Sequence, residues 1–193
     1  MKKYIKELTK FCNDIYEGEQ KVLVFGEGYE RSAIMLIGEA PGEQEALEGR
    51  PFVGKAGKNL DEFLALSGFD RRELYITNTV KFRPVKTSDA GRTVNRTPSR
   101  EEVALFSPWL EREIHLIKPE CIVTLGNTAL RALLGKNVTI GQVHGRFQMK
   151  GSQLMYPMYH PASVIYNRAL RDTYIEDIKR LADWRNDRRQ SAE

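Results

Sequence analysis

Short apolar runs alternate along this chain with segments of helical periodicity, and neither an internal repeat nor a low-complexity segment breaks the pattern. The apolar runs predict buried strands over residues 33–37, 74–80, 121–125 and 154–158. Strands that alternate with helices are typical of an α/β fold with a parallel sheet. We therefore predict a single α/β domain over residues 1–193.

Helical periodicity predicts helices over about 57–67, from Ser99 to before Pro119, through 130–135 and over about 170–184. Ser99 and Glu102 have the spacing of a capping box, which marks where the long helix begins. The polar stretch 86–97 predicts a mobile loop at the edge of the sheet. The charged tail after residue 184 is expected to fray.

Composition narrows the class of protein only a little. Hydrophobic residues make up 41% of the chain and charged residues 29%, which is typical of a soluble globular protein. The net charge of +4 permits a polyanionic partner without identifying it. No apolar run reaches the length of a membrane span, and no signal peptide follows Met1. We therefore expect no membrane association and a cytoplasmic location.

Polar residues follow three of the predicted strands, in segments 38–42, 76–78 and 159–163. Any one of these segments alone would be interpreted as an ordinary turn. In an open parallel sheet, however, the carboxyl ends of the strands converge on one crevice, where ligands bind. The three segments together therefore predict one site at that edge of the sheet.

The motifs around these segments resemble those of family 4 uracil-DNA glycosylases, in the same order and at the expected distances. They are GEAPGEQE at 38–45, GRPFVGKAG at 49–57, YITNTVK at 75–81 and YHPAS at 159–163. The resemblance implies a three-layer α/β/α fold around a central four-stranded parallel sheet. It also implies a DNA repair glycosylase that flips uracil out of single- or double-stranded DNA, hydrolyses its N-glycosidic bond and leaves an abasic site. Activity on other deaminated bases stays open.

The resemblance assigns catalytic roles to Glu39 and His160. Breaking the glycosidic bond makes a cationic sugar and a departing uracil anion, so the site must stabilise both charges and supply water. The Glu39 carboxylate is expected to orient the water and stabilise the sugar. His160, as a neutral imidazole, is expected to donate a hydrogen bond to uracil O2, an effect of the oxyanion-hole kind worth ~3–4 kcal/mol.

Four further residues are expected to bind uracil. Phe52 offers an aromatic face for stacking on the base, which contributes roughly 1–3 kcal/mol. The Asn78 amide has a donor and an acceptor that match uracil O4 and N3–H, whereas cytosine reverses both. By resemblance, Ala40 contributes its backbone to the pocket, and Glu45 forms the wall that excludes the 5-methyl group of thymine.

Contacts to DNA phosphates are expected from polar and basic residues in or beside the motifs, namely Lys55, Lys81, Arg83, Ser163 and Arg168. The segment 164–168 is also expected to supply the wedge that fills the gap left by the flipped base. The choice among its residues stays open. We expect the partner to be uracil-containing DNA and the protein to act as a monomer.

The cysteines depart from the family pattern. Family 4 enzymes typically hold an iron-sulfur cluster through four cysteines, but two of those positions correspond here to Phe82 and Phe106. The chain has two cysteines, Cys12 and Cys121, which form no CxxC pair and predict neither a zinc site nor a disulfide framework. Because such clusters need four protein ligands, we predict that no iron-sulfur cluster and no other cofactor or metal is bound.

A second departure lies in residues 87–97, which resemble the insertion of a related group that binds uracil-DNA covalently through a histidine. Asn95 stands before Arg96-Thr97-Pro98, where that group has its histidine. Because an asparagine side chain is a poor nucleophile, we predict turnover rather than a trapped protein–DNA adduct.

Two other functions stay open. A protein of this fold could bind uracil-DNA, covalently or not, without cleaving it. A small α/β enzyme could instead bind free nucleotides by cradling a phosphate in the turn 38–42. That turn lacks the Gly-Lys-Ser/Thr ending of a phosphate-binding loop, and the charge of Glu39 would repel a phosphate.

Overall fold

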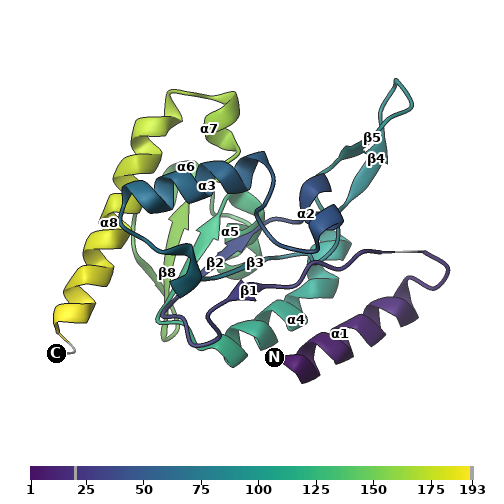
Figure 1. The fold of residues 1–193 in the computed structure, drawn as a ribbon, viewed down its shortest axis with the longest axis horizontal. Helices are drawn as coiled ribbons and strands as arrows, with labels where there is room; N and C mark the ends of the chain where they lie inside the picture. Colours follow the sequence, from purple (N-terminus) through teal and green to yellow (C-terminus); the bar gives the residue numbers. More distant parts are fainter. Residues whose placement is uncertain (20, 192–193) are drawn as a thin grey trace.

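The computed structural model describes residues 1–19 and 21–191. At its centre lie four parallel strands, in the spatial order β3 (Tyr75–Asn78), β2 (Ile34–Gly38), β6 (Cys121–Leu125) and β8 (Gln153–Met158) (Figure 1). Every residue of β2, β3 and β6 is buried, which explains why β2 and β6 are mostly apolar. The prediction of an α/β fold is confirmed.

The whole sheet has six strands, so the expectation of four is incomplete. β1 (Glu27–Gly28) pairs with β3, and β7 (Gln148–Lys150) pairs with β8, both in antiparallel orientation. These edge strands have two and three residues, and none of those residues is buried. Strands this short carry no hydrophobic alternation that a sequence pattern can reveal.

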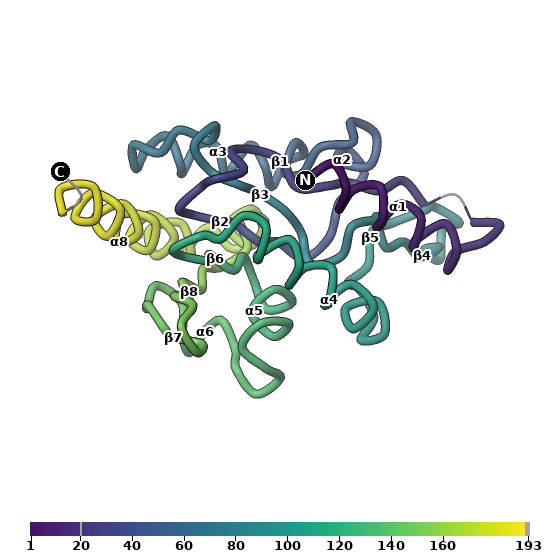
Figure 2. Tube along the Cα trace, turned by 90° about the horizontal axis from the view of Figure 1, so that it is seen from below, coloured from purple at the N-terminus to yellow at the C-terminus, as the bar shows by residue number. Residues whose placement is uncertain are grey.

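Helices cover both faces of the sheet, which gives three layers (Figure 2). On one face, α3 (Lys55–Leu66) and α8 (Leu170–Gln190) pack their buried side chains against the strands. On the other face, α4 (Arg100–Ile117) and α5 (Asn127–Leu134) do the same. Successive residues of a strand point to opposite faces, so a strand covered on both sides is apolar throughout.

The remaining helices are α1 (Lys2–Ile15), α2 (Glu43–Glu48), α6 (Ile140–Val143), α7 (Ser163–Tyr166) and the 3-10 turn η1 (Arg71–Glu73). The sequence patterns do not predict α1, which lies beside α4 (Figure 1) and shares a buried apolar cluster with it. Across the residues that the structure describes, no helix combines the length and the apolar character needed to cross a lipid bilayer.

Two segments are more ordered than the sequence predicts. The stretch expected to be a mobile loop forms an antiparallel hairpin of β4 (Val85–Thr87) and β5 (Thr93–Asn95), which projects from the body of the fold (Figure 1). Backbone hydrogen bonds hold these two strands together. Their side chains are not buried in alternation, so the sequence carries no strand pattern here. The tail expected to fray after residue 184 continues as α8 to Gln190.

Candidate active site

The predicted recognition residues meet at the carboxyl edge of the sheet. β2 ends at Gly38 and β3 at Asn78, and these two residues are partners in the parallel ladder. A Cβ atom placed on Gly38 would lie 2.5 Å from Asn78 Oδ1 and 2.5 Å from Phe52 Cζ. The absence of a side chain at this position therefore lets the amide and the aromatic ring approach one another. His160 follows the end of β8, and its ring stacks on that of Phe52.

Phe52 is held in an unusual conformation. Its φ of 52° lies in the left-handed region that bulky residues rarely adopt. Its ring stacks on His160, with 5.7 Å between the ring centroids and 30° between the planes. The Arg71 guanidinium donates hydrogen bonds to the carbonyls of Pro51 at 2.8 Å and Phe52 at 3.2 Å, which fix this turn. Arg71 lies outside every motif, so the sequence does not point to it.

His160 is partly buried, and burial lowers the pKa of its imidazole to about 4, although the nearby Glu45 carboxylate acts in the opposite direction. The ring is therefore neutral at pH 7. Its Nδ1 accepts a hydrogen bond from the backbone N–H of Ala162 at 3.2 Å. Because Nδ1 is an acceptor, the ring proton is assigned to Nε2, which leaves an N–H donor for a ligand.

Glu39 directly follows β2 and lines a cavity of about 320 Å³ at this edge, together with His160 and Tyr159. Thr128, near the start of α5, donates a hydrogen bond to Glu39 Oε2. Ala40, the other pocket residue predicted beside Glu39, is partly buried. The motifs do not point to Thr128, although it stands just after the buried strand β6. Applying the strand-end rule to all four strands would have found it.

Glu45 is a buried carboxylate of α2 that accepts three backbone hydrogen bonds. The donors are the N–H groups of Gly42 at 3.1 Å, Val53 at 3.0 Å and Gly54 at 2.8 Å. These bonds join the first motif to the turn that carries Phe52, because backbone donors on both segments share one carboxylate. The role of Glu45 against the thymine methyl group stays a prediction.

Four of the five expected DNA contacts are accessible. Lys55 and Arg168 are exposed, and Ser163 lines the cavity beside His160. Arg83 is partly exposed, and its Nη1 lies 3.2 Å from Glu43 Oε1. The phosphate contacts of these four residues stay predictions.

Lys81 is the fifth, and the structure contradicts its expected contact with DNA. Its side chain is 0% exposed, and its ammonium lies 2.6 Å from Oε2 of Glu113, a residue of α4 that is also fully buried. Burial lowers the pKa of the Lys81 ammonium, and the Glu113 carboxylate acts in the opposite direction. An enclosed ammonium cannot reach a phosphate outside the fold. A position within a motif does not determine which way the side chain points.

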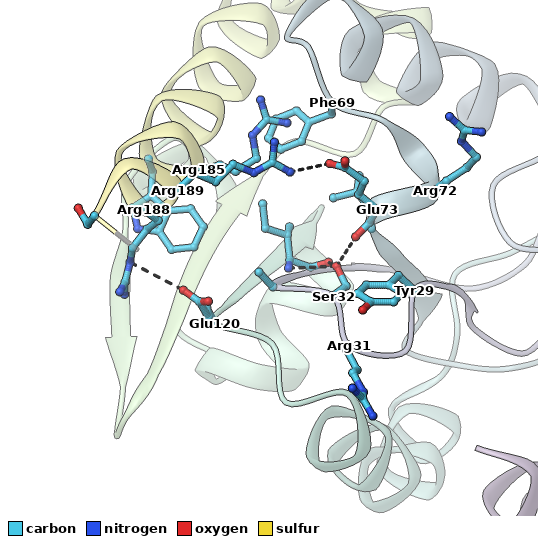
Figure 3. A pocket seen from close by; sticks show the side chains of 15 residues that line it. Tyr29, Arg31, Ser32, Phe69, Arg72, Glu73, Glu120, Arg185, Arg188 and Arg189 are labelled. Carbon is cyan, nitrogen blue, oxygen red and sulfur yellow. Dashed lines mark hydrogen bonds and ion pairs between the residues drawn. The ribbon is translucent and has the colours of Figure 1, made fainter. Parts of the chain in front are cut away.

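A larger cavity of about 660 Å³ lies at the opposite, amino edge of the sheet (Figure 3). Its lining includes Ile34, the first residue of β2. Two of its arginines pair with glutamates of the same lining, Arg189 with Glu73 at 2.8 Å and Arg188 with Glu120 at 3.8 Å. Ligands of open parallel sheets bind outside the carboxyl ends of the strands. The candidate site is therefore the smaller cavity and the strand ends beside it.

Apolar side chains occupy the region where the resemblance implies an iron-sulfur cluster. The rings of Phe82 and Phe106 lie 5.7 Å apart and share a buried cluster with Cys12 of α1. Cys121 belongs to a different cluster, in β6. The two cysteines of the chain therefore do not fit a site made of four thiolates. Within residues 1–19 and 21–191, no group of three or more His, Cys, Asp or Glu residues is arranged to hold a metal ion.

The fold and these side chains define an α/β protein with a candidate site of polar side chains at the carboxyl edge of a parallel sheet. A family model described as the Uracil DNA glycosylase superfamily matches residues 25–182. The chain belongs to this superfamily.

Several similar proteins are named type-4 uracil-DNA glycosylases. The type-4 uracil-DNA glycosylase of Sulfurisphaera tokodaii is 40% identical over 167 residues, which cover 82% of this chain and 72% of the relative. That of Saccharolobus solfataricus is 40% identical over 173 residues, covering 85% and 76%. That of Thermotoga maritima is 41% identical over 162 residues, covering 82% and 80%. The similarity to the superfamily that the motifs predict is confirmed.

Proposed function

We propose that this chain is a uracil-DNA glycosylase, which hydrolyses the N-glycosidic bond of uracil in DNA and leaves an abasic site. The family match and the type-4 relatives, which align with 82–85% of the chain, support this. The observation that carries the proposal is that Asn78 and Phe52 meet at Gly38 and that the Phe52 ring stacks on His160. A base extruded from DNA needs such a set of polar and stacking groups to hold it.

Asn78 reads the flipped base. Its side chain is 3% exposed, so a base that fails to pair with it leaves buried polar groups without partners. Uracil presents O4 to the amide N–H and N3–H to the amide oxygen, whereas cytosine presents a donor and an acceptor in the reverse order. Phe52 stacks on the same base from its strained turn.

Glu39 stabilises the positive charge that develops on the sugar, and His160 stabilises the negative charge that develops on uracil. The electron pair of the bond between uracil N1 and the sugar leaves with the base, and His160 Nε2–H donates to O2, where negative charge develops. The Glu39 carboxylate, held by Thr128, orients a water molecule toward the cationic sugar. The water oxygen bonds to C1′, its proton passes to Glu39, and the uracil anion takes a proton from solvent.

Tyr166 supplies the wedge. It is 88% exposed at the end of α7, six residues after His160, and Ile165 beside it is 42% exposed. A large ring held in water beside the site can fill the space of the extruded base by contacting its neighbours in the stack. Lys55 and Arg168 then hold the flanking phosphates.

The apolar cluster of Phe82, Phe106 and Cys12 takes the structural place of an iron-sulfur cluster. Buried aromatic rings stabilise this corner of the fold by excluding water, without any bond to a metal. Purified protein is expected to be colourless and to lack stoichiometric iron. A brown chromophore with iron in proportion to protein would contradict this.

The reaction proceeds by turnover, without a lasting protein–DNA bond. Asn95 lies beside the first motif: its Oδ1 accepts a hydrogen bond from Arg83 Nε at 2.7 Å, and its Nδ2 would lie 3.4 Å from a Cβ atom on Gly42. An amide at this position cannot replace an imidazole as nucleophile. An adduct with uracil-containing DNA that survives boiling on a denaturing gel would overturn this part of the proposal.

Labelled oligonucleotides that carry uracil, hypoxanthine or no lesion, single-stranded and in duplex, test the proposal after alkali treatment. We expect scission at uracil with the wild-type protein, and its loss in Glu39→Ala and Asn78→Ala. Binding of uracil-DNA without scission would instead indicate a non-catalytic protein of the same fold. Absence of both binding and scission would contradict any role in uracil repair.

A further inference from the structure

A buried cluster of polar groups lies beneath the candidate site, on the face of the sheet covered by α4. Lys81 Nζ donates hydrogen bonds to Glu113 Oε2 at 2.6 Å, to Thr77 Oγ1 at 2.7 Å and to the Asn78 carbonyl at 2.6 Å. The Tyr75 hydroxyl donates to Glu113 Oε1 at 2.9 Å. Both charged side chains are 0% exposed. The three donors of the ammonium are therefore all used inside the protein.

Glu113 lies at a position of α4 where the helical periodicity predicts a buried apolar residue. The buried residues of α4 are Phe106, Leu110, Glu113 and Ile117, which recur at intervals of three and four. The space around the carboxylate is closed, since a Cβ atom on Gly26 would lie 2.6 Å from Glu113 Oε1. Polar groups buried in this way need partners, and Lys81 and Tyr75 supply them.

The cluster connects directly to the two segments that carry the proposed chemistry. Lys81 Nζ holds the carbonyl of Asn78, three residues earlier, and so closes the turn after β3. Within that turn, Thr79 donates its N–H at 2.9 Å and its hydroxyl at 2.8 Å to the Gly38 carbonyl. The N–H of Val80 donates to the Glu39 carbonyl at 3.1 Å. One turn therefore fixes the backbone of both Asn78 and Glu39.

Burial of an ion pair is a poor way to stabilise a fold, because removing two charges from water costs several kcal/mol per ion. Apolar replacements of such pairs are often as stable as the original. A buried pair bonded to the backbone of a site has a different use, since it allows one arrangement of the turn and excludes others. The contribution of Lys81 and Glu113 is therefore expected in the geometry of the turn after β3 and not in the stability of the fold.

We infer that Lys81 and Glu113 are positioning residues for uracil excision. They hold the turn after β3 so that the Asn78 amide can bind the uracil base while the Glu39 carboxylate lies beside the sugar of the same nucleotide. This inference rests on the proposed function. Neither residue touches the substrate. A shift of about 1 Å between the groups that bind the base and those that activate water is enough to lower the rate on the order of 10²-fold.

The decisive variant is the double substitution Lys81→Met/Glu113→Leu, which removes both charges and leaves neither without a partner. We expect it to fold with an unfolding midpoint close to that of the wild type. Its single-turnover rate of uracil excision should fall about 10²-fold while KM for the uracil oligonucleotide stays unchanged. Lys81→Met alone leaves the Glu113 carboxylate buried and unpaired, so this variant should lose thermal stability as well as rate.

Leu110→Ala is the matched control, because Leu110 is buried on the same face of α4 and its aliphatic side chain makes no hydrogen bond to Lys81 or Glu113. It should lower the unfolding midpoint and leave the excision rate of the folded protein unchanged.

An excision rate of the double variant equal to that of the wild type would overturn the inference. So would a double variant that does not fold, since the pair would then be needed for stability, and so would a loss of rate in Leu110→Ala equal to that in the double variant. Wild-type protein that leaves uracil-DNA intact would instead overturn the proposed function, and this inference with it.

Discussion

The two edges of the central sheet both carry cavities lined by charged residues, yet they differ in how those residues are held. At the amino edge, a cavity of about 660 Å³ is lined by arginines, of which Arg188 and Arg189 pair with exposed carboxylates (Figure 3). The side chains of Arg188 and Arg189 are 60% and 59% exposed. At the carboxyl edge, the cavity is half that size, at about 320 Å³, and two partly buried side chains of its lining are fixed within the protein, Glu39 by Thr128 and His160 by the backbone N–H of Ala162.

This difference supports the proposal that the functional site lies at the carboxyl edge. Exposed ion pairs interact through water, where their attraction is small and salt weakens it further. Buried groups held in one orientation act on a ligand in a medium of lower dielectric constant and need no rearrangement when charge develops. The size of a cavity therefore identifies the chemistry less well than the burial and fixation of its polar side chains.

The largest contrast between the two edges should come from their carboxylates. Glu39→Gln at the carboxyl edge removes the group proposed to activate water, and we expect the excision rate to fall on the order of 10²–10⁴-fold. Glu73→Gln, at the amino edge, should leave the rate unchanged. Single-turnover assays on one uracil oligonucleotide measure both. Equal effects of the two substitutions would remove the distinction between the edges.

Gly38→Ala should have the next largest effect. Its Cβ atom would lie 2.5 Å from both Asn78 Oδ1 and Phe52 Cζ, so the base pocket must distort, and we expect kcat/KM to fall on the order of 10²-fold. Gly141→Ala is the control, because a Cβ there meets only the Tyr159 hydroxyl at 3.8 Å. That control should keep full activity. A Gly38→Ala protein that is equally active would mean that uracil does not bind beside this strand end.

The lowered pKa of His160 predicts a pH dependence of stability. The folded imidazole protonates only near pH 4, whereas the ordinary value is 6.5, so the unfolded chain binds the extra proton first as pH falls. The free energy of unfolding should therefore decrease as pH falls from 6.5 toward 4. His160→Gln cannot titrate, and its unfolding midpoint should fall less between pH 7 and pH 5. Parallel curves for the two proteins would contradict the lowered pKa.

The smallest effects should come from surface arginines. Arg188→Ala at the amino edge should change the free energy of unfolding by no more than about 0.5 kcal/mol and leave DNA affinity unchanged. Arg168→Ala at the carboxyl edge should weaken binding to all sequences alike and reduce the salt slope of binding by about 1. Titrations of uracil-containing DNA at several salt concentrations measure both. A salt slope that responds to Arg188 and not to Arg168 would place DNA at the other edge.

The central part of the fold could be predicted because its signals are local. Mostly apolar runs mark β2 and β6, and the reciprocal bonds of Ser99 and Glu102 confirm the predicted capping box of α4. Edge strands and the hairpin escape such patterns, because their backbone bonds form without burial of alternating side chains.

The sequence by itself determined the α/β class, the order of the motifs and the strand ends where polar residues gather. Only the tertiary structure decided which of these side chains are buried and which partners they contact, and Lys81 is the clearest case. As a lysine inside a motif it predicts contact with DNA, but Glu113, 32 residues further along the chain, turns it inward. Partners so distant in sequence meet only when the sheet and α4 pack together, so no local pattern can reveal them.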